Sequence, residues 1–276
     1  MHKNIIKDEW FSAYYIKDGI WRISDNCQDN IYLVIGEDKA LLIDTGWGVG
    51  NLPEFAGKIT SLPLVAANTH GHFDHALGND SFDYVYVGEQ DSQRFSSLHI
   101  NEKRNFAKNS KLLTEVKTMT EFDNWGTHAR KQDIILHNMQ QIELGGRTLT
   151  AYLTPGHTKG GVCFLDKKAG VLFTGDSFIP SDAWGPAWFH LKESALLSEF
   201  YEKMSSVTAG GGFDYLLTGH GECGLIPLEN ILIFLNGIKG IIDGKICGIQ
   251  EKTFAGDGLR CDWKGSSIVY DPGKLK

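Results

Sequence analysis

Four residues that can bind a metal ion occupy six consecutive positions of the sequence. His70, His72, Asp74 and His75 follow an apolar run at 64–69. In a chain of 276 residues with 10 His, this pattern arises by accident in about one sequence per thousand. Three imidazoles and a carboxylate packed together leave many polar atoms to satisfy, and a divalent cation satisfies them at once. The segment therefore predicts a metal site.

The spacing of this cluster suggests two metal positions. Residues two apart in an extended segment point the same way, so His70 and His72 can reach one ion, while Asp74 and His75 can address a second. Three further candidates lie beside glycines at the ends of apolar runs: His157, Asp176 and His220. Imidazoles with carboxylates suit zinc, and iron and manganese remain open. Seven ligands exceed the needs of one tetrahedral ion, so we expect two Zn²⁺ ions.

Two similar segments are expected to position these residues. Residues 31–46 and 161–178 each read as apolar strand, charged turn, second apolar strand and a terminal acid. Helices are expected at 52–61, 194–206 and 227–243, and a strand pair near 253–270. A mostly helical insertion is expected at about 89–137. Strands alternating with helices predict an α/β protein, and the lack of a polar linker predicts a single domain over 1–276.

Composition and charge exclude several classes of protein. With 42% hydrophobic and 22% charged residues the chain is an ordinary globular protein, and its net charge of −7 argues against nucleic acid or membrane as a partner. The five cysteines never form a C-x-x-C pair, and charged residues interrupt the first apolar positions. We therefore expect a cytoplasmic protein with a small-molecule substrate. A homo-oligomer is compatible with the sequence.

The motifs resemble those of the metallo-β-lactamase superfamily in their order along nearly the whole chain. They are LIDTG at 42–46, THGHFDH at 69–75, PGHT at 155–158, TGDS at 174–177 and TGHG at 218–221. The resemblance implies a four-layer αββα sandwich made of two similar halves. It also implies that His70, His72 and His157 bind the first metal, that Asp74, His75 and His220 bind the second, and that Asp176 bridges them. By the same resemblance Asp44 lies beneath the site and orients the ligands.

The chemistry expected of such a site is hydrolysis. Two divalent ions can share a water molecule, lower its pKa and supply hydroxide to a carbonyl carbon, and Asp74 is the expected catalytic residue that orients it. β-Lactamases of this superfamily lack the bridging acid, so Asp176 favours a glyoxalase II-like or lactonase-like site and an ester, thioester or lactone substrate. The best-known lactonases place a tyrosine where this sequence has Ile179, which argues against that one identity.

The substrate pocket and the rival functions depend on the surrounding segments. The loop at 177–190 carries Phe178, Trp184, Trp188 and His190, which are expected either to line an apolar pocket or simply to pack on the sheet. The same ligands also serve phosphodiesterases such as ribonuclease Z, and a subset serves persulfide dioxygenases with one iron. A metal-containing binding module without activity is the non-enzymatic alternative.

Overall fold

The chain divides into two compact units. The computed structural model describes residues 5–25, 29–92, 132–182, 185–221, 224–253 and 255–276. Unit 1 comprises Met1–Ile135 with Leu144–Gly146, and unit 2 comprises Leu136–Glu143 with Arg147–Lys276. Each unit contains one of the two similar segments expected from the sequence. That the whole chain is a single domain stays a prediction.

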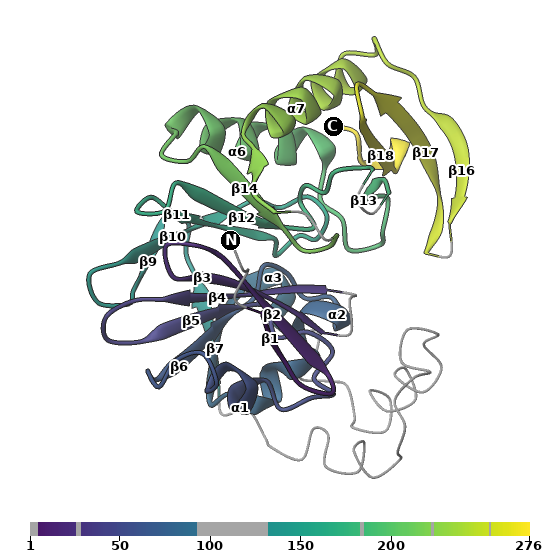
Figure 1. Ribbon diagram of the computed structural model, residues 1–276. Helices are drawn as coiled ribbons and strands as arrows, with labels where there is room; N and C mark the ends of the chain where they lie inside the picture. Colours follow the sequence, from purple (N-terminus) through teal and green to yellow (C-terminus); the bar gives the residue numbers. More distant parts are fainter. Residues whose placement is uncertain (1–4, 26–28, 93–131, 183–184, 222–223, 254) are drawn as a thin grey trace. The chain divides into compact units, whose positions relative to one another are not determined.

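Unit 1 is built on a mixed sheet whose eight strands, within the described residues, follow one another in chain order (Figure 1). The first five pair antiparallel, whereas β5, β6 and β7 pair parallel. The strands are β1 (Ile5–Lys7), β2 (Phe11–Lys17), β3 (Ile20–Asp25), β4 (Asp29–Ile35), β5 (Ala40–Ile43), β6 (Leu64–Ala67), β7 (Tyr84–Gly88) and β8 (Gln132–Leu136). The helical segments are α1 (Leu52–Ala56), α2 (Phe73–Ala76), η1 (Leu77–Ser81) and α3 (Glu89–Ser92).

One face of this sheet forms the core of unit 1 with α1. The Asn51 side chain accepts a hydrogen bond from the Glu54 backbone N–H, which caps the helix, and Pro53 lies in its first turn. Phe55 on α1 packs against Phe11 on β2, with ring centroids 5.1 Å apart. The helix expected at 52–61 therefore begins as predicted and ends earlier, at Ala56.

In unit 1, the parallel pairing of β5 with β6 places the first residues of two loops at the same edge of the sheet. Ile43 at the end of β5 is in register with Ala67 at the end of β6, and the Asp44 backbone N–H donates to the Ala67 carbonyl at 2.8 Å. Parallel strands release their following residues at the same edge, where α/β proteins commonly place functional groups. Asp44 and the segment leading to His70 therefore leave the sheet together.

Unit 2 contains two sheets within the part of the chain that is described. The larger has the order β15-β14-β12-β11-β10-β9, and the smaller has the order β13-β18-β17-β16. The strands are β9 (Gln140–Glu143), β10 (Thr148–Leu153), β11 (Val162–Asp166), β12 (Val171–Gly175), β13 (Ala187–Phe189), β14 (Tyr215–Thr218), β15 (Ile226–Pro227), β16 (Ile249–Thr253), β17 (Gly256–Trp263) and β18 (Ser266–Tyr270). The helical segments are α6 (Leu197–Gly210), α7 (Glu229–Ile242) and η3 (Pro272–Lys274).

Helices α6 and α7 lie side by side and share one apolar core with both sheets of unit 2 (Figure 1). Phe200 on α6 and Phe234 on α7 are fully buried, and Phe234 stacks on Trp263 of β17 with centroids 5.8 Å apart. The Trp263 indole N–H donates to the Ile233 carbonyl at 3.0 Å, which fixes the ring against α7. These contacts confirm the helices expected near 194–206 and 227–243. The expected C-terminal strand pair corresponds to β17 and β18.

The two similar segments are confirmed as equivalent hairpins in the two units. β4 and β5 form the first, β11 and β12 form the second, and the second strand of each then pairs parallel with the next strand of its sheet. Asp44 directly follows β5 and Asp176 directly follows β12. The same backbone arrangement thus places one acid at the end of each hairpin.

The predicted insertion is described only at its two ends. Residues 89–92 form α3 and residues 132–136 form β8, whereas 93–131 lie outside the described residues. Among the helices that the structure describes, none is both long enough and apolar enough to cross a lipid bilayer.

Candidate metal centre

Unit 1 gathers His70, His72, Asp74 and His75, which we call the amino-terminal donor group. β6 ends at Ala67, His70 follows in the loop, and His72 precedes the short helix α2, which carries Asp74 and His75. His72 has an extended backbone, and its carbonyl accepts hydrogen bonds from the backbone N–H groups of His75 and Ala76. The chain therefore turns at His72, as the sequence predicts, and separates the first two histidines from the second two residues.

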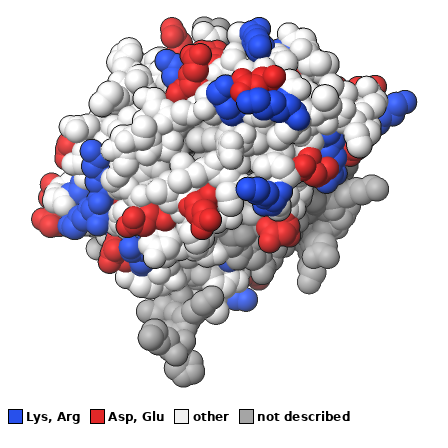
Figure 2. All heavy atoms as spheres, turned by 90° about the horizontal axis from the view of Figure 1, so that it is seen from above, with Lys and Arg blue, Asp and Glu red and all other residues white. Residues whose placement is uncertain are grey.

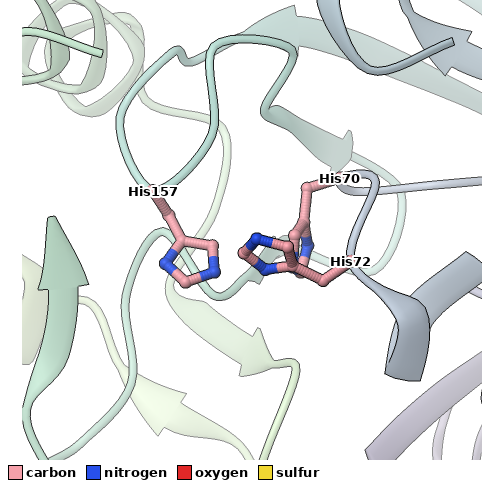
Figure 3. A group of neighbouring side chains, drawn as sticks. All are labelled: His70, His72 and His157. Carbon is pink, nitrogen blue, oxygen red and sulfur yellow. The ribbon is translucent and has the colours of Figure 1, made fainter. Parts of the chain in front are cut away.

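His70 and His72 present nitrogens to each other. Nε2 of His70 lies 3.0 Å from Nδ1 of His72, and their rings meet edge to face with centroids 4.7 Å apart. Figure 3 shows both side chains, together with His157 on its own loop. Tetrahedral ligands about 2.1 Å from a zinc ion are separated by about 3.4 Å, so this spacing suits two donors to one ion.

The orientation of His70 is fixed from behind by Thr69. The Thr69 hydroxyl donates to Oδ2 of Asp44 at 2.8 Å and lies 3.1 Å from Nδ1 of His70. Because the single hydroxyl proton goes to Asp44, the contact with His70 requires an N–H on Nδ1. Nε2 of His70 is then the nitrogen with the lone pair, which is the form that binds a metal.

The orientation of His75 is fixed in the same way by Asp44. Nδ1 of His75 lies 2.9 Å from Oδ2 of Asp44, so it carries the proton, and Nε2 faces Oδ2 of Asp74 at 3.6 Å. Oδ1 of Asp44 accepts a further hydrogen bond from the Thr69 backbone N–H at 2.7 Å. Asp44 adopts φ 65°, a left-handed conformation that aspartate tolerates better than most residues. One carboxylate thus orients two histidines, one of them through Thr69.

Three polar residues that the sequence did not single out hold α2 in place. The His75 carbonyl accepts hydrogen bonds from the Thr45 backbone N–H at 2.8 Å and from the Asn68 side chain at 3.0 Å. Asn79 accepts from the Thr45 hydroxyl and donates to the Asn68 side chain. A signal for Asn68 was present, since a polar residue directly follows the apolar run of β6. Thr45 lies within the LIDTG motif at 42–46, whereas Asn79 had no comparable signal.

Unit 2 gathers His157, Asp176 and His220, which we call the carboxy-terminal donor group. Asp176 follows β12 and His220 lies two residues beyond β14, at the shared edge of two parallel strands. Oδ2 of Asp176 lies 3.2 Å from Nε2 of His220 and 3.6 Å from Nε2 of His157. All three side chains are buried. One carboxylate oxygen therefore faces two imidazole nitrogens.

Backbone groups orient His157 in this second group. Nδ1 of His157 lies 2.7 Å from the Trp188 carbonyl, which can only accept a hydrogen bond, so Nδ1 carries the proton. The Ser194 hydroxyl donates to the His157 carbonyl at 3.0 Å and holds its loop. Nε2 of His157 is left with the lone pair and faces Asp176. No sequence signal identifies Trp188 for this role, because any residue type offers a carbonyl.

The donors fit a divalent cation in their chemistry. In both groups imidazole Nε2 atoms lie 3.2–3.6 Å from a carboxylate oxygen, near the separation of ligands that share an ion. Three of the histidines carry their proton on Nδ1, which leaves Nε2 as the donor atom. Such outer hydrogen bonds to ligating histidines are typical of metal sites.

The residues expected to line a substrate pocket have different surroundings. Phe178 is fully buried against Phe234 in the core of unit 2, which agrees with the packing alternative and not with a pocket lining. Trp188 is half-buried on β13, and Nε2 of His190 lies 2.9 Å from the Thr253 hydroxyl. Burial lowers the pKa of His190 below its ordinary value. Trp184 lies outside the described residues.

Charges of both signs are mixed on the surface. On the face drawn in Figure 2, lysine and arginine side chains lie among aspartate and glutamate side chains and form no broad area of one sign. This face does not offer the continuous basic surface that binds a phosphate backbone.

Comparison with protein families identifies the family to which this chain belongs. The model of the metallo-beta-lactamase superfamily matches residues 24–88 and 98–222, which include both donor groups. Two solved structures are similar in fold. A metallo-beta-lactamase from Erythrobacter litoralis has a TM-score of 0.60 at 15% identity over 84% of this chain and 98% of its own. A metallo-beta-lactamase family protein from Thermus thermophilus has a TM-score of 0.54 at 18% identity over 78% of this chain and 76% of its own.

Two curated relatives are similar in sequence. The human protein named acyl-coenzyme A thioesterase MBLAC2 is 30% identical over 185 residues, which cover 61% of this chain and 66% of the human protein. The alignment thus spans just under two thirds of that relative. The probable metallo-hydrolase YqgX of Bacillus subtilis is 24% identical over 77% of this chain and 94% of its own length. The match to the family model and the shared fold confirm the α/β class and the resemblance found in the sequence: the chain belongs to the metallo-β-lactamase superfamily.

Proposed function

We propose that the chain is a metal-dependent hydrolase that cleaves the thioester bond of an acyl-coenzyme A. One observation carries the metal-dependent part of the proposal. Nδ1 of His70, His75 and His157 is hydrogen-bonded to Thr69, Asp44 and Trp188, respectively, so that Nε2 is the donor atom. Histidines that serve only packing do not need three separate hydrogen-bond partners that impose the same tautomer. A metal site does require such partners.

Two zinc ions are the proposed cofactor, with the ligands that family membership implies. His70, His72 and His157 would hold the first ion, Asp74, His75 and His220 the second, and Asp176 would bridge them. When bound, such a pair of ions lowers the pKa of a water molecule towards neutrality and polarises a carbonyl group. The Nε2-to-carboxylate spacings within each donor group support this assignment.

The residues of the chain position the reactants around that chemistry. Asp74 is the proposed catalytic residue, because its side chain is 25% exposed whereas the His75 side chain is fully buried, so Asp74 can reach a water molecule. Its carboxylate would accept a hydrogen bond from the attacking water molecule and so direct a lone pair of the water oxygen at the carbonyl carbon. Asp44 would keep His75 in the metal-binding tautomer throughout.

The choice of a thioester rests on the relatives. The MBLAC2 proteins of human, cattle and chicken, which are 28–30% identical to this chain, are all named acyl-coenzyme A thioesterases. The mixed charge in Figure 2 also favours a small molecule over a nucleic acid. We further propose the cytoplasm as the compartment, since Cys163, Cys247 and Cys261 are free thiols; fractionation of cells that express the protein would test this.

A substrate panel on zinc-loaded protein tests the function. We expect the protein to hydrolyse acyl-coenzyme A, and the release of the free thiol monitors this reaction. We expect no hydrolysis of bis-p-nitrophenyl phosphate. The Asp74→Ala variant should lose at least about 100-fold in kcat while its circular dichroism is unchanged. Asp257→Asn, at an exposed carboxylate on β17, is the control and should keep full activity.

Three outcomes would contradict the proposal. Cleavage of the phosphodiester without cleavage of any thioester would replace carbonyl chemistry by phosphodiester chemistry. One iron per chain with oxygen consumption would indicate a redox enzyme. Protein that holds cations but turns over no member of the panel would leave a binding module.

A further inference from the structure

An additional buried acid lies beside the amino-terminal donor group. Asp29 is the first residue of β4, and it is 2% exposed. It pairs in register with Asp25, the last residue of β3. Buried carboxylates are costly unless charged or hydrogen-bonding partners compensate them, so an acid kept at the start of a buried strand calls for a reason.

Asp29 is close enough to Asp74 and His75 to share a ligand with them. A carboxylate oxygen of Asp29, a carboxylate oxygen of Asp74 and a ring nitrogen of His75 all lie within 4.8 Å of one another. Nδ1 of His75 is occupied by Asp44, and its Nε2 faces Asp74. Asp29 thus adds a third donor of unit 1 to a position for which the sequence indicated, within this unit, only Asp74 and His75.

The charges of these side chains favour a bound cation. Two carboxylates at such a separation repel each other, and the repulsion is stronger in a buried site than in water. A divalent cation placed among them changes the repulsion into attraction and accepts the imidazole lone pair as well. The three side chains therefore fit a cation better than they fit one another.

We propose that Asp29 is a ligand of the cation position formed by Asp74 and His75. The inference rests on the proposed metal-dependent function and adds a residue to it. With Asp29, this position has two carboxylates, whereas His70 and His72 provide only imidazoles. Carboxylate oxygens suit Mn²⁺ better than an imidazole-rich site does, so the Asp29 position should tolerate Mn²⁺ more readily than the other.

Neighbouring contacts hold Asp29 in place. Oδ1 of Asp25 accepts a hydrogen bond from the Asp29 backbone N–H at 3.3 Å, and Oδ2 of Asp25 accepts from the Trp47 backbone N–H at 2.9 Å. Asp25 therefore fixes the start of β4 against the loop that follows Asp44. Asp25 also shares a side-chain hydrogen bond with Asp29, so it supports Asp29 and is no control. Asp18, an exposed acid between β2 and β3 that is not among the grouped donor atoms, serves as the control.

Metal titration of the full chain tests the proposal. Wild-type, Asp29→Asn and Asp18→Asn proteins would be stripped of metal and titrated with Zn²⁺ and with Mn²⁺, and the bound metal would be counted per chain. We expect Asp29→Asn to weaken one of two positions by about 10- to 100-fold, with a larger loss for Mn²⁺ than for Zn²⁺. Asp18→Asn should keep the affinity for both ions within a few-fold.

Thermal unfolding without metal separates a ligand from a structural residue. Asparagine keeps the shape of Asp29 and removes the repulsion, so metal-free Asp29→Asn should unfold at or above the wild-type temperature and gain less from added Zn²⁺. Equal metal affinity in wild type and Asp29→Asn would overturn the inference and leave the hydrolase proposal standing. A lower unfolding temperature of metal-free Asp29→Asn would also overturn it, because the loss of affinity would then follow from a damaged fold. Wild-type protein that binds no cation would overturn both proposals.

Discussion

The Asp44 carboxylate and the His75 imidazole form a buried pair in which Oδ2 lies 2.9 Å from Nδ1. Both side chains are almost inaccessible to solvent, at 3% and 0% exposure. The same carboxylate accepts from both the backbone and the side chain of Thr69. Asp44 therefore controls the protonation pattern of the amino-terminal donor group without being one of its donors.

Replacing Asp44 by asparagine should weaken metal binding by about 10- to 100-fold. Asparagine tolerates the left-handed backbone at φ 65°, but its amide group would turn a donor towards either Thr69 or His75, where an acceptor is needed. Competition with a chromophoric chelator measures the affinity. Asp18→Asn, at an exposed left-handed position with φ 43°, is the control and should bind metal as wild type does. Equal affinity in the Asp44 and Asp18 variants would contradict the orienting role.

Removing the buried partner of Asp166 should destabilise unit 2. Nε of Arg147 donates to Oδ2 of Asp166 at 2.8 Å, and the Asp166 side chain is fully buried. Arg147→Met would leave that charge without its guanidinium partner, which costs about 3–5 kcal/mol of unfolding free energy. Urea denaturation followed by tryptophan fluorescence would measure it. Lys239→Met, which removes an exposed ion pair with Asp243, should leave the midpoint unchanged. Equal urea midpoints for Arg147→Met and Lys239→Met would show that the buried ion pair stabilises the protein no more than the exposed one.

Adding one methyl group at Gly237 should also destabilise unit 2. A Cβ at this position of α7 would overlap Cε2 of Trp263, a ring already held by its hydrogen bond to the Ile233 carbonyl. Gly237→Ala should therefore lower the unfolding free energy by about 1–3 kcal/mol through overpacking. Gly210→Ala, at the end of α6, meets nothing within 4 Å and should be neutral or slightly stabilising. Differential scanning calorimetry distinguishes them, and a stable Gly237→Ala protein would refute the packing described for Trp263.

The His190 side chain should make stability depend on pH. Burial lowers its pKa in the folded protein, so below about 6.5, the ordinary value, the unfolded chain binds the proton more readily. The unfolding free energy should therefore fall as the pH falls below about 6.5. Well above that pH neither the folded nor the unfolded chain binds this proton, so His190 no longer makes the unfolding free energy depend on pH. His190→Gln, which can still hydrogen-bond to Thr253, should flatten this part of the profile. Parallel profiles for wild type and His190→Gln between pH 5 and 8 would contradict the assignment.

Much of the fold was predictable because apolar runs and turns are local signals. The hairpins β4–β5 and β11–β12 and the helices α6 and α7 all appear where their patterns place them. The strands β1, β2 and β3 were missed, although Phe11 and Ala13 alternate with more exposed neighbours in the manner of a half-buried strand. The charged residues nearby obscured that period.

The donor groups were easier to predict than their supports. Histidine and aspartate are rare enough in close spacing for the cluster at 70–75 to stand out. Trp188 supports His157 through its backbone carbonyl, which leaves no trace in the residue type. Asp29 lies more than forty positions before its neighbours Asp74 and His75, and the pairing of β4 with β5 and of β5 with β6 brings it to them. Long-range proximity of this kind is decided by the sheet and cannot be inferred from local spacing.

Asp44 and Asp176 end equivalent hairpins, yet they meet opposite sides of the imidazole ring. Asp44 contacts a proton-bearing Nδ1, whereas Asp176 faces the Nε2 of two histidines. The two acids therefore have different tasks at the ends of equivalent hairpins, and Asp44 differs from Asp176 in its left-handed backbone as well as in the ring nitrogen that it meets. Equivalent hairpins can thus end either in an acid that holds a proton-bearing nitrogen or in an acid that faces two donor nitrogens.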